Sequence, residues 1–117
     1  LSLHDALPIC LRALLACGAE QGWLLPKSGG PSVRFGRLAK DLGGYSVDAV
    51  RMEGPAAEHT HPAGEINLGF AWSGAPTFDG RPPGWVVFPP ASRHVPTVAG
   101  GSMLLLYFLP GGQVVWH

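Results

Sequence analysis

Residues 65–72, EINLGFAW, alternate strictly between apolar side chains and small or polar ones. Side chains of an extended strand point alternately to its two faces, whereas a helix would repeat every 3.6 residues. The alternation therefore predicts a β-strand with one apolar face. The apolar side consists of Ile66, Leu68, Phe70 and Trp72, and the other side of Glu65, Asn67, Gly69 and Ala71.

Four further segments share this strand character, and one segment has a helical period. In residues 9–21, Leu11, Leu14, Leu15 and Gly18 recur three and four residues apart, which predicts one face of a helix. After that, abundant glycine and proline divide the chain into short pieces typical of an all-β domain. The further predicted strands are 33–39, 45–52, 85–88 and 102–109, the last apolar on both faces, and Asp79-Gly80 predicts a turn.

Short strands at this spacing favour a β-sandwich or a closed barrel. We expect a jelly-roll β-barrel with a short N-terminal helix, because closure removes strand edges on which such apolar strands would aggregate. Residues 10–117 contain no repeat or linker and predict a single domain. Residues 1–9, LSLHDALPI, resemble a translated sequencing adapter. We therefore expect the natural sequence to start at residue 10 of this chain, and an N-terminal part of the natural protein to be missing.

Charge and cysteine usage exclude several classes of partner. Eight basic and eight acidic residues balance without any block of like charge, so we expect neither nucleic-acid nor membrane binding. No apolar run is long enough to span a bilayer. Cys10 and Cys17 would lie roughly 10 Å apart in a helix, too far for a disulfide. Two free thiols favour a reducing, cytoplasmic location.

Two of the five histidines are separated by a single residue, in the segment HTHPAGE. His59 and His61 would leave the same face of a strand, Glu65 follows a Pro-Gly turn, and His94 follows a tight turn after a short strand. Three imidazoles and a carboxylate are ligands for a divalent transition metal such as Fe, Mn, Ni or Zn. Four protein ligands close a tetrahedral zinc site but leave two positions open on an octahedral ion.

The same segments resemble known families. HTHPAGE resembles the first cupin motif, His-x-His-x3-Glu, and GWVVFPPASRH resembles the second, which contributes one more histidine. Across nearly everything after residue 9, VRFGRL, GYSVDAV, FDGRPPGWVVFPPASRHVPTV and LLLYFLPGG are similar to the bacterial 4-hydroxylaminobenzoate lyases. This resemblance implies a cupin-like enzyme of nitroarene degradation that converts 4-hydroxylaminobenzoate and water to 3,4-dihydroxybenzoate (protocatechuate) and ammonia. Family members carry an additional N-terminal region.

That activity suggests roles for further residues. Either Glu58 or metal-bound water would move protons, and Glu58 and the ligand Glu65 are the candidate catalytic carboxylates. An arginine, either Arg51 or Arg93, would clamp the substrate carboxylate with its planar fork. A wall around the small aromatic substrate is expected from Trp72, Trp85, Phe88 and Tyr107.

Two other functions compete with this hypothesis. A metal-dependent cupin dioxygenase acting on an aromatic or thiol substrate would consume oxygen, whereas the lyase reaction needs none. A non-catalytic cupin that binds a small molecule would need no turnover, and such modules are usually fused to a DNA-binding helical domain. Strand edges of small cupins commonly pair, so we also expect a homodimer.

Overall fold

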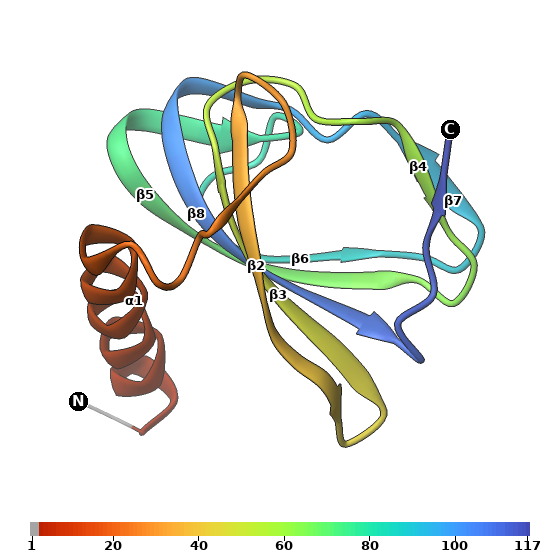
Figure 1. The fold of residues 1–117 in the computed structure, drawn as a ribbon, viewed down its shortest axis with the longest axis horizontal. Coiled ribbons are helices and arrows are strands. Elements are labelled where there is room, and N and C mark those ends of the chain that lie inside the picture. The colour runs from red at the N-terminus through yellow and green to blue at the C-terminus, as the bar shows by residue number, and fades with distance from the viewer. Residues whose placement is uncertain (1–2) are drawn as a thin grey trace.

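The computed structural model describes residues 3–117, with side chains from Cys10 onward, as one helix and nine strands (Figure 1). Helix α1, Leu3–Gln21, begins six residues before the expected start at residue 9. The interpretation of residues 1–9 as a translated sequencing adapter falls on residues whose side chains lie outside the described part of the chain. The strands are β1 Lys27–Ser28, β2 Val33–Leu42, β3 Tyr45–Met52, β4 His59–His61, β5 Glu65–Phe78, β6 Gly84–Phe88, β7 Ser92–His94, β8 Val98–Pro110 and β9 Val115–Trp116.

Every predicted strand is present, and two of them are much longer than expected. Strand β2 continues for three residues beyond the expected end at residue 39. The bounds of 45–52 are confirmed as β3, and 85–88 gains one residue in β6. Strands β5 and β8 extend well beyond 65–72 and 102–109 because they pair with each other along most of their length, from Ile66 opposite Phe108 to Phe78 opposite Val98. Two register shifts interrupt this pairing, so the long ribbon bends where the apolar alternation ends.

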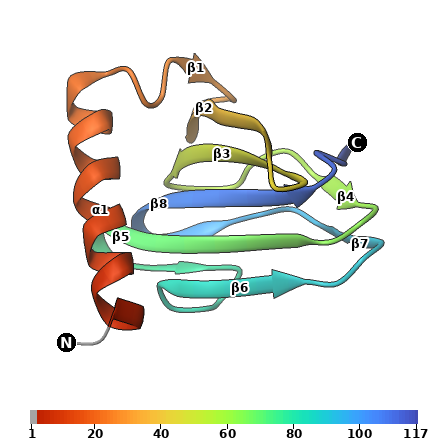
Figure 2. The same ribbon diagram turned by 90° about the horizontal axis from the view of Figure 1, so that it is seen from below.

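The strands form two antiparallel sheets. Six strands make the large sheet, in the order β1-β2-β3-β8-β5-β6, and three make the small sheet, in the order β7-β4-β9. Figure 1 shows the small sheet on one side of the large sheet and α1 on the other. In Figure 2 the helix runs across the strands at one end, and β4 and β7 lie at the opposite end.

An apolar cluster joins α1 to the outer face of the large sheet. It contains Leu15 of the helix, Leu68 and Phe70 of β5, and Leu104 of β8, all no more than 8% exposed. The apolar face of β5 therefore packs outward, against the helix. Leu14 was expected on the buried helical face but is 67% exposed, because only one side of the helix, with Leu11, Leu15 and Gly18, turns toward the sheet.

A second apolar cluster fills part of the space between the two sheets. Met103 and Leu105 of β8 contribute to it from positions that alternate with those of the outer cluster. Strand β8 is thus buried on both faces, as its continuous apolar run predicted. The other members are Val33, Val50, Met52, Phe78, Val86 and Val98.

Smaller expectations also have outcomes in the structure. The Asp79-Gly80 turn is confirmed: both residues have positive φ, and the backbones of Phe78 and Arg81 exchange two hydrogen bonds around them. Cys10 and Cys17 are both free thiols. Among the described helical residues, no stretch has the length and apolarity that crossing a membrane requires. The homodimer and the cytoplasmic location stay predictions.

Candidate metal centre

The small sheet brings three histidines to one place through its register. Strand β4 pairs antiparallel with β7, so that His59 lies opposite His94 and His61 lies opposite Ser92. His59 and His61 are two residues apart and project from the same face, as the sequence predicted. That face points into the barrel, where the two side chains are 3% and 0% exposed.

Glu65 reaches the same place from the first position of β5, a strand of the large sheet. The turn after His61 is closed by a hydrogen bond from the Gly64 backbone nitrogen to the His61 carbonyl oxygen, at 3.2 Å. Gly64 has a φ of 89°, and a Cβ there would lie 2.9 Å from the Phe88 carbonyl oxygen. The turn therefore requires glycine. Beyond it Glu65 is 2% exposed, and the Asn67 amide donates a hydrogen bond of 2.9 Å to its carboxylate.

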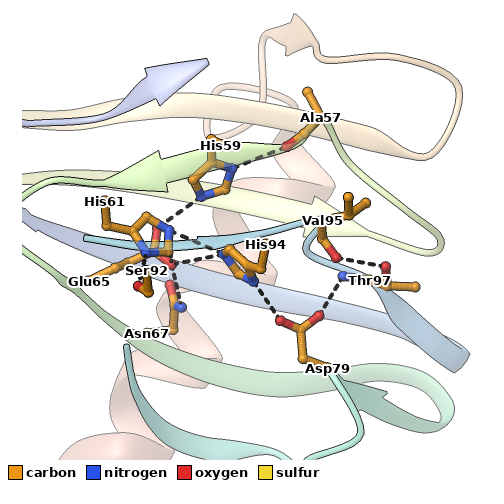
Figure 3. A network of polar contacts seen from close by, with 10 residues as sticks. All are labelled: Ala57, His59, His61, Glu65, Asn67, Asp79, Ser92, His94, Val95 and Thr97. Atoms are coloured by element: carbon orange, nitrogen blue, oxygen red, sulfur yellow. Dashed lines mark hydrogen bonds and ion pairs between the residues drawn. The ribbon is translucent and has the colours of Figure 1, made fainter. Parts of the chain in front are cut away.

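The four predicted ligands converge (Figure 3). One donor atom from each of His59, His61, Glu65 and His94 lies within 4.8 Å of the others. The Nε2 atoms of His61 and His94 are 3.1 Å apart, and Glu65 oxygens lie 3.7, 3.2 and 3.9 Å from the Nε2 atoms of His59, His61 and His94. Nitrogen and carboxylate donors crowded in this way are suited to share one cation.

Outer contacts fix the direction in which each imidazole presents its nitrogen. The Nδ1 atoms of His59 and His94 donate to the Ala57 carbonyl oxygen at 3.1 Å and to the Asp79 carboxylate at 2.6 Å. Since both partners only accept, the neutral forms of these rings carry their free lone pair on Nε2. Nδ1 of His61 contacts the Ser92 hydroxyl at 3.0 Å. Such partners are the usual support of metal-binding histidines, so the residues fit a metal ion.

The protonation of the cluster follows from its burial and its mutual contacts. Burial opposes ionisation of Glu65, but contacts with His59, His61 and Asn67 outweigh it and lower the pKa to about 2. Burial lowers the pKa of His94 despite the neighbouring Asp79 carboxylate. For His59 the attraction of Glu65 and the Ala57 carbonyl overcomes burial and raises the pKa. Glu65 is thus an anion near neutral pH, as a metal ligand must be.

A cavity of about 560 Å³ adjoins this cluster inside the barrel, with His59 and Glu65 in its wall. Most of the remaining wall is apolar and includes Phe35, Met52 and Trp116. Size and lining are those of a site for a small, mainly apolar molecule. A metal centre at the wall of such a cavity is able to act on a molecule bound within it.

Tyr107, one of the predicted substrate-binding residues, belongs to the cavity wall. Its hydroxyl is buried and has no hydrogen-bond partner among the described residues. Burial raises the pKa of the phenol well above its usual value, with the carboxylates of Glu65 and Asp79 adding to the effect. Phe88, another aromatic of the predicted wall, does not line the cavity, but its ring centroid lies 4.4 Å from that of His94.

The structure places the other predicted site residues away from the cavity. Glu58 and Arg93 form an exposed ion pair of 2.7 Å on the outer side of the small sheet. Arg51 alternates with the cavity-lining Val50 and Met52 and so projects from the opposite face of β3. Trp85 is 57% exposed and stacks on Phe108 outside the barrel, and Trp72 packs with the outer cluster.

Several residues at the site were missed by the sequence analysis. Asn67 and Ser92 each stand two residues from a predicted ligand, so the alternation of a strand would have placed them on the ligand face. Asp79 was interpreted only as a turn residue, and nothing local in the sequence links it to His94. Its Oδ2 accepts a hydrogen bond from Nδ1 of His94, and its Oδ1 accepts one of 2.8 Å from the Thr97 backbone nitrogen.

The barrel has the fold of the cupins. Solved cupin structures share the fold: an RmlC-like cupin protein from Ralstonia eutropha has a TM-score of 0.59 at 12% identity, over 80% of this chain and 64% of that one. A cupin-like protein from Thermotoga maritima has a TM-score of 0.52 at 18% identity, over 78% of this chain and 86% of that one. The predicted cupin-like, all-β fold class is confirmed.

Sequence comparison narrows the class to one family. The family described as PnbB, 4-hydroxylaminobenzoate lyase, matches residues 8–116, and the chain belongs to it. A 4-hydroxylaminobenzoate lyase from Nocardioides sp. (strain LMS-CY) is 33% identical over 86% of this chain and 67% of its own length. One from Pseudomonas putida is 28% identical over 89% of this chain and 70% of its own length. The predicted lyase family is therefore confirmed.

Proposed function

We propose that this protein is a metal-dependent 4-hydroxylaminobenzoate lyase, whose products are 3,4-dihydroxybenzoate and ammonia. The observation that carries the proposal is the convergence of three imidazoles and one carboxylate at the wall of an apolar cavity. Family membership supplies the substrate. The cavity is suited to a single benzene ring, and the donor cluster adjoins it.

His59, His61, Glu65 and His94 would hold a divalent transition metal. When bound, such an ion supplies Lewis acidity toward the hydroxylamine oxygen. Residues around the four ligands hold them in position. Asp79, Ser92 and the Ala57 carbonyl keep the three imidazoles aimed at the centre, and Asn67 holds the Glu65 carboxylate.

Within the cavity, the Tyr107 hydroxyl is the group best placed to contact the reacting end of the substrate. It is buried without a partner in the described protein, and its neighbours Glu65 and Asp79 are anionic. The raised pKa keeps the phenol protonated near neutral pH. Tyr107 would therefore donate a hydrogen bond to the substrate nitrogen or oxygen, and the apolar wall would exclude bulk water.

The overall reaction balances without an added oxidant. The N–O bond, the ring C–N bond and one ring C–H bond break, two ring C–O bonds form, and the nitrogen gains the two protons that complete ammonia. Reduction of the nitrogen by two electrons matches oxidation of the ring by two electrons. One water is consumed for each ammonia released, so oxygen consumption during turnover would instead favour a dioxygenase.

The direct test replaces His61 with alanine and measures bound metal by mass spectrometry and ammonia release from 4-hydroxylaminobenzoate. Loss of one of four ligands should remove most of the metal and reduce turnover at least a thousandfold, an order expected when metal-ion catalysis is lost. His117→Ala is the matched control, because His117 contacts Thr60 rather than the cluster. Undiminished turnover by His61→Ala would remove the metal from the mechanism.

A further inference from the structure

One permanently charged cation lines the cavity in the described part of the chain, and it is Arg37 of β2. It alternates with Val33 and Phe35, which line the same cavity, so its side chain leaves the inner face of the strand. Arg51 and Arg93, the two arginines predicted to bind substrate, do not line this cavity. An anionic group within the cavity therefore has Arg37 as its natural partner.

Arg37 lies in a row of polar residues that crosses the apolar inner face toward the metal centre. The register places Arg37 opposite Asp48, Asp48 opposite Tyr107, and Tyr107 opposite Asn67. Asn67 contacts the ligand Glu65. Three strand spacings separate the ends of the row, or about 14 Å between Cα atoms along the sheet. An extended arginine side chain and a para-substituted benzene ring together span a separation of that order.

The contact between Arg37 and Asp48 leaves the outer end of the guanidinium open. Nε of Arg37 donates to Oδ1 of Asp48, and neither Nη atom has a partner among the described residues. Asp48 is the more buried of the two, with a side chain 17% exposed against 52% for Arg37. Asp48 thus orients the guanidinium, and the two Nη groups form a fork of the shape that a carboxylate accepts.

From this geometry we infer that Arg37 binds the carboxylate of the aromatic substrate, oriented by Asp48, and so points the para substituent at the metal centre. The inference rests on the proposed function for the identity of the substrate. It assigns specificity to the cavity: aromatic acids bind in preference to uncharged aromatic molecules of the same size. Since Arg37 and Asp48 together are neutral, the preference comes from directed hydrogen bonds more than from net charge.

The test compares benzoate with benzamide, its uncharged counterpart, by calorimetric titration of the metal-loaded full chain. Arg37→Gln should weaken benzoate binding about ten- to one-hundredfold, the range expected for lost hydrogen bonds to a charged group, and leave benzamide binding unchanged. Arg37→Lys keeps the charge without the fork and should fall between Arg37→Gln and the unaltered protein. The matched control is Lys40→Gln, which removes one exposed positive charge from the same strand.

Turnover measurements give a second test of the role of Arg37. Arg37→Gln should raise KM for 4-hydroxylaminobenzoate by the same factor and leave kcat/KM for phenylhydroxylamine unchanged. Equal losses with charged and uncharged ligands, or no loss with either, would overturn the role of Arg37. If the unaltered protein binds benzoate in preference to benzamide through Arg37 but releases no ammonia, the anion site stands and the proposed lyase activity fails.

Discussion

The two faces of β5 lie in different environments. Its outward side chains, including Leu68 and Phe70, pack against α1 in a wholly apolar cluster. Its inward side chains begin with two buried polar groups, Glu65, which contacts the histidines of the small sheet, and Asn67, which donates a hydrogen bond to Glu65. One strand thus supplies packing on one face and chemistry on the other. Changes to the two faces should accordingly separate stability from activity.

The comparison also explains why the inner face tolerates so many polar groups. Each histidine, and Glu65, has a polar partner, so the cost of removing these groups from water is offset locally. The outer face has no such requirement and stabilises the fold through buried apolar area. Loss of packing on the outer face should therefore lower mainly the free energy of unfolding. Loss of a polar partner on the inner face should lower mainly the metal affinity and the turnover.

The largest change in stability is expected from Leu104→Ala on the outer face. Leu104 is 2% exposed beneath α1, so the truncation should lower the free energy of unfolding by about 2–5 kcal/mol. Turnover per folded molecule should stay the same. Urea denaturation and ammonia release at low temperature check the two expectations.

Leu105→Ala makes the same truncation at the next residue, on the inner face. Leu105 packs with Val50 and Met52, which line the cavity. A similar loss of stability should therefore come with a raised KM. If both variants changed KM equally, the proposed separation between the two faces would be wrong.

Of the two faces of β5, only the inner one is expected to make the free energy of unfolding depend on pH. The pKa of Glu65 is lowered from 4.5 to about 2 in the folded chain, so the anion stabilises the fold above pH 4.5. This contribution should disappear as pH falls from 4.5 toward 2, and its full size is about 3 kcal/mol. Urea denaturation of the metal-free protein should show it, and Glu65→Gln should lack it. Parallel curves for the two proteins over that range would argue against an ionised Glu65.

Local patterns in the sequence account for much of this site. Alternation predicted β5, and the i, i+2 spacing predicted the shared direction of His59 and His61. The same alternation did not reveal that the apolar side of β5 faces the helix rather than the barrel interior. That outcome depends on α1, which covers the sheet from outside and leaves the small and polar side of β5 to line the interior.

Residues that depend on pairing between distant strands were beyond local patterns. Alternation places Arg37 on the same face of β2 as Val33 and Phe35, but only the register with β3 brings it opposite Asp48. Asp79 reaches His94 across 15 residues of sequence, and that contact leaves no periodic signal. Trp85 shows the opposite case. Its aromatic side chain suggested a place in the substrate wall, but it lies on the outer face of β6, a strand at the edge of the large sheet.

A smaller effect is expected from Asp79→Asn, which keeps the shape of the side chain and removes its charge. His94 would lose the acceptor that holds its Nδ1 proton, so metal affinity should fall about ten- to one-hundredfold. Competition with a chelator measures that affinity. Glu20→Gln, an equivalent change at an exposed position of α1, is the control. Unchanged affinity in Asp79→Asn would mean that Asp79 only supports the Thr97 backbone.

The smallest effect is expected from Glu58→Gln, on the side of the small sheet that faces away from the cavity. Glu58 is 39% exposed, and its ion pair with Arg93 lies in solvent. An exposed pair of this kind is screened by solvent and contributes little, so the midpoint of urea denaturation should hardly change. Turnover should stay within about twofold of the unaltered protein, since Glu58 does not line the cavity. A large loss of kcat with intact metal content would return Glu58 to the catalytic role that the sequence suggested, and would show that both faces of the small sheet take part in the chemistry.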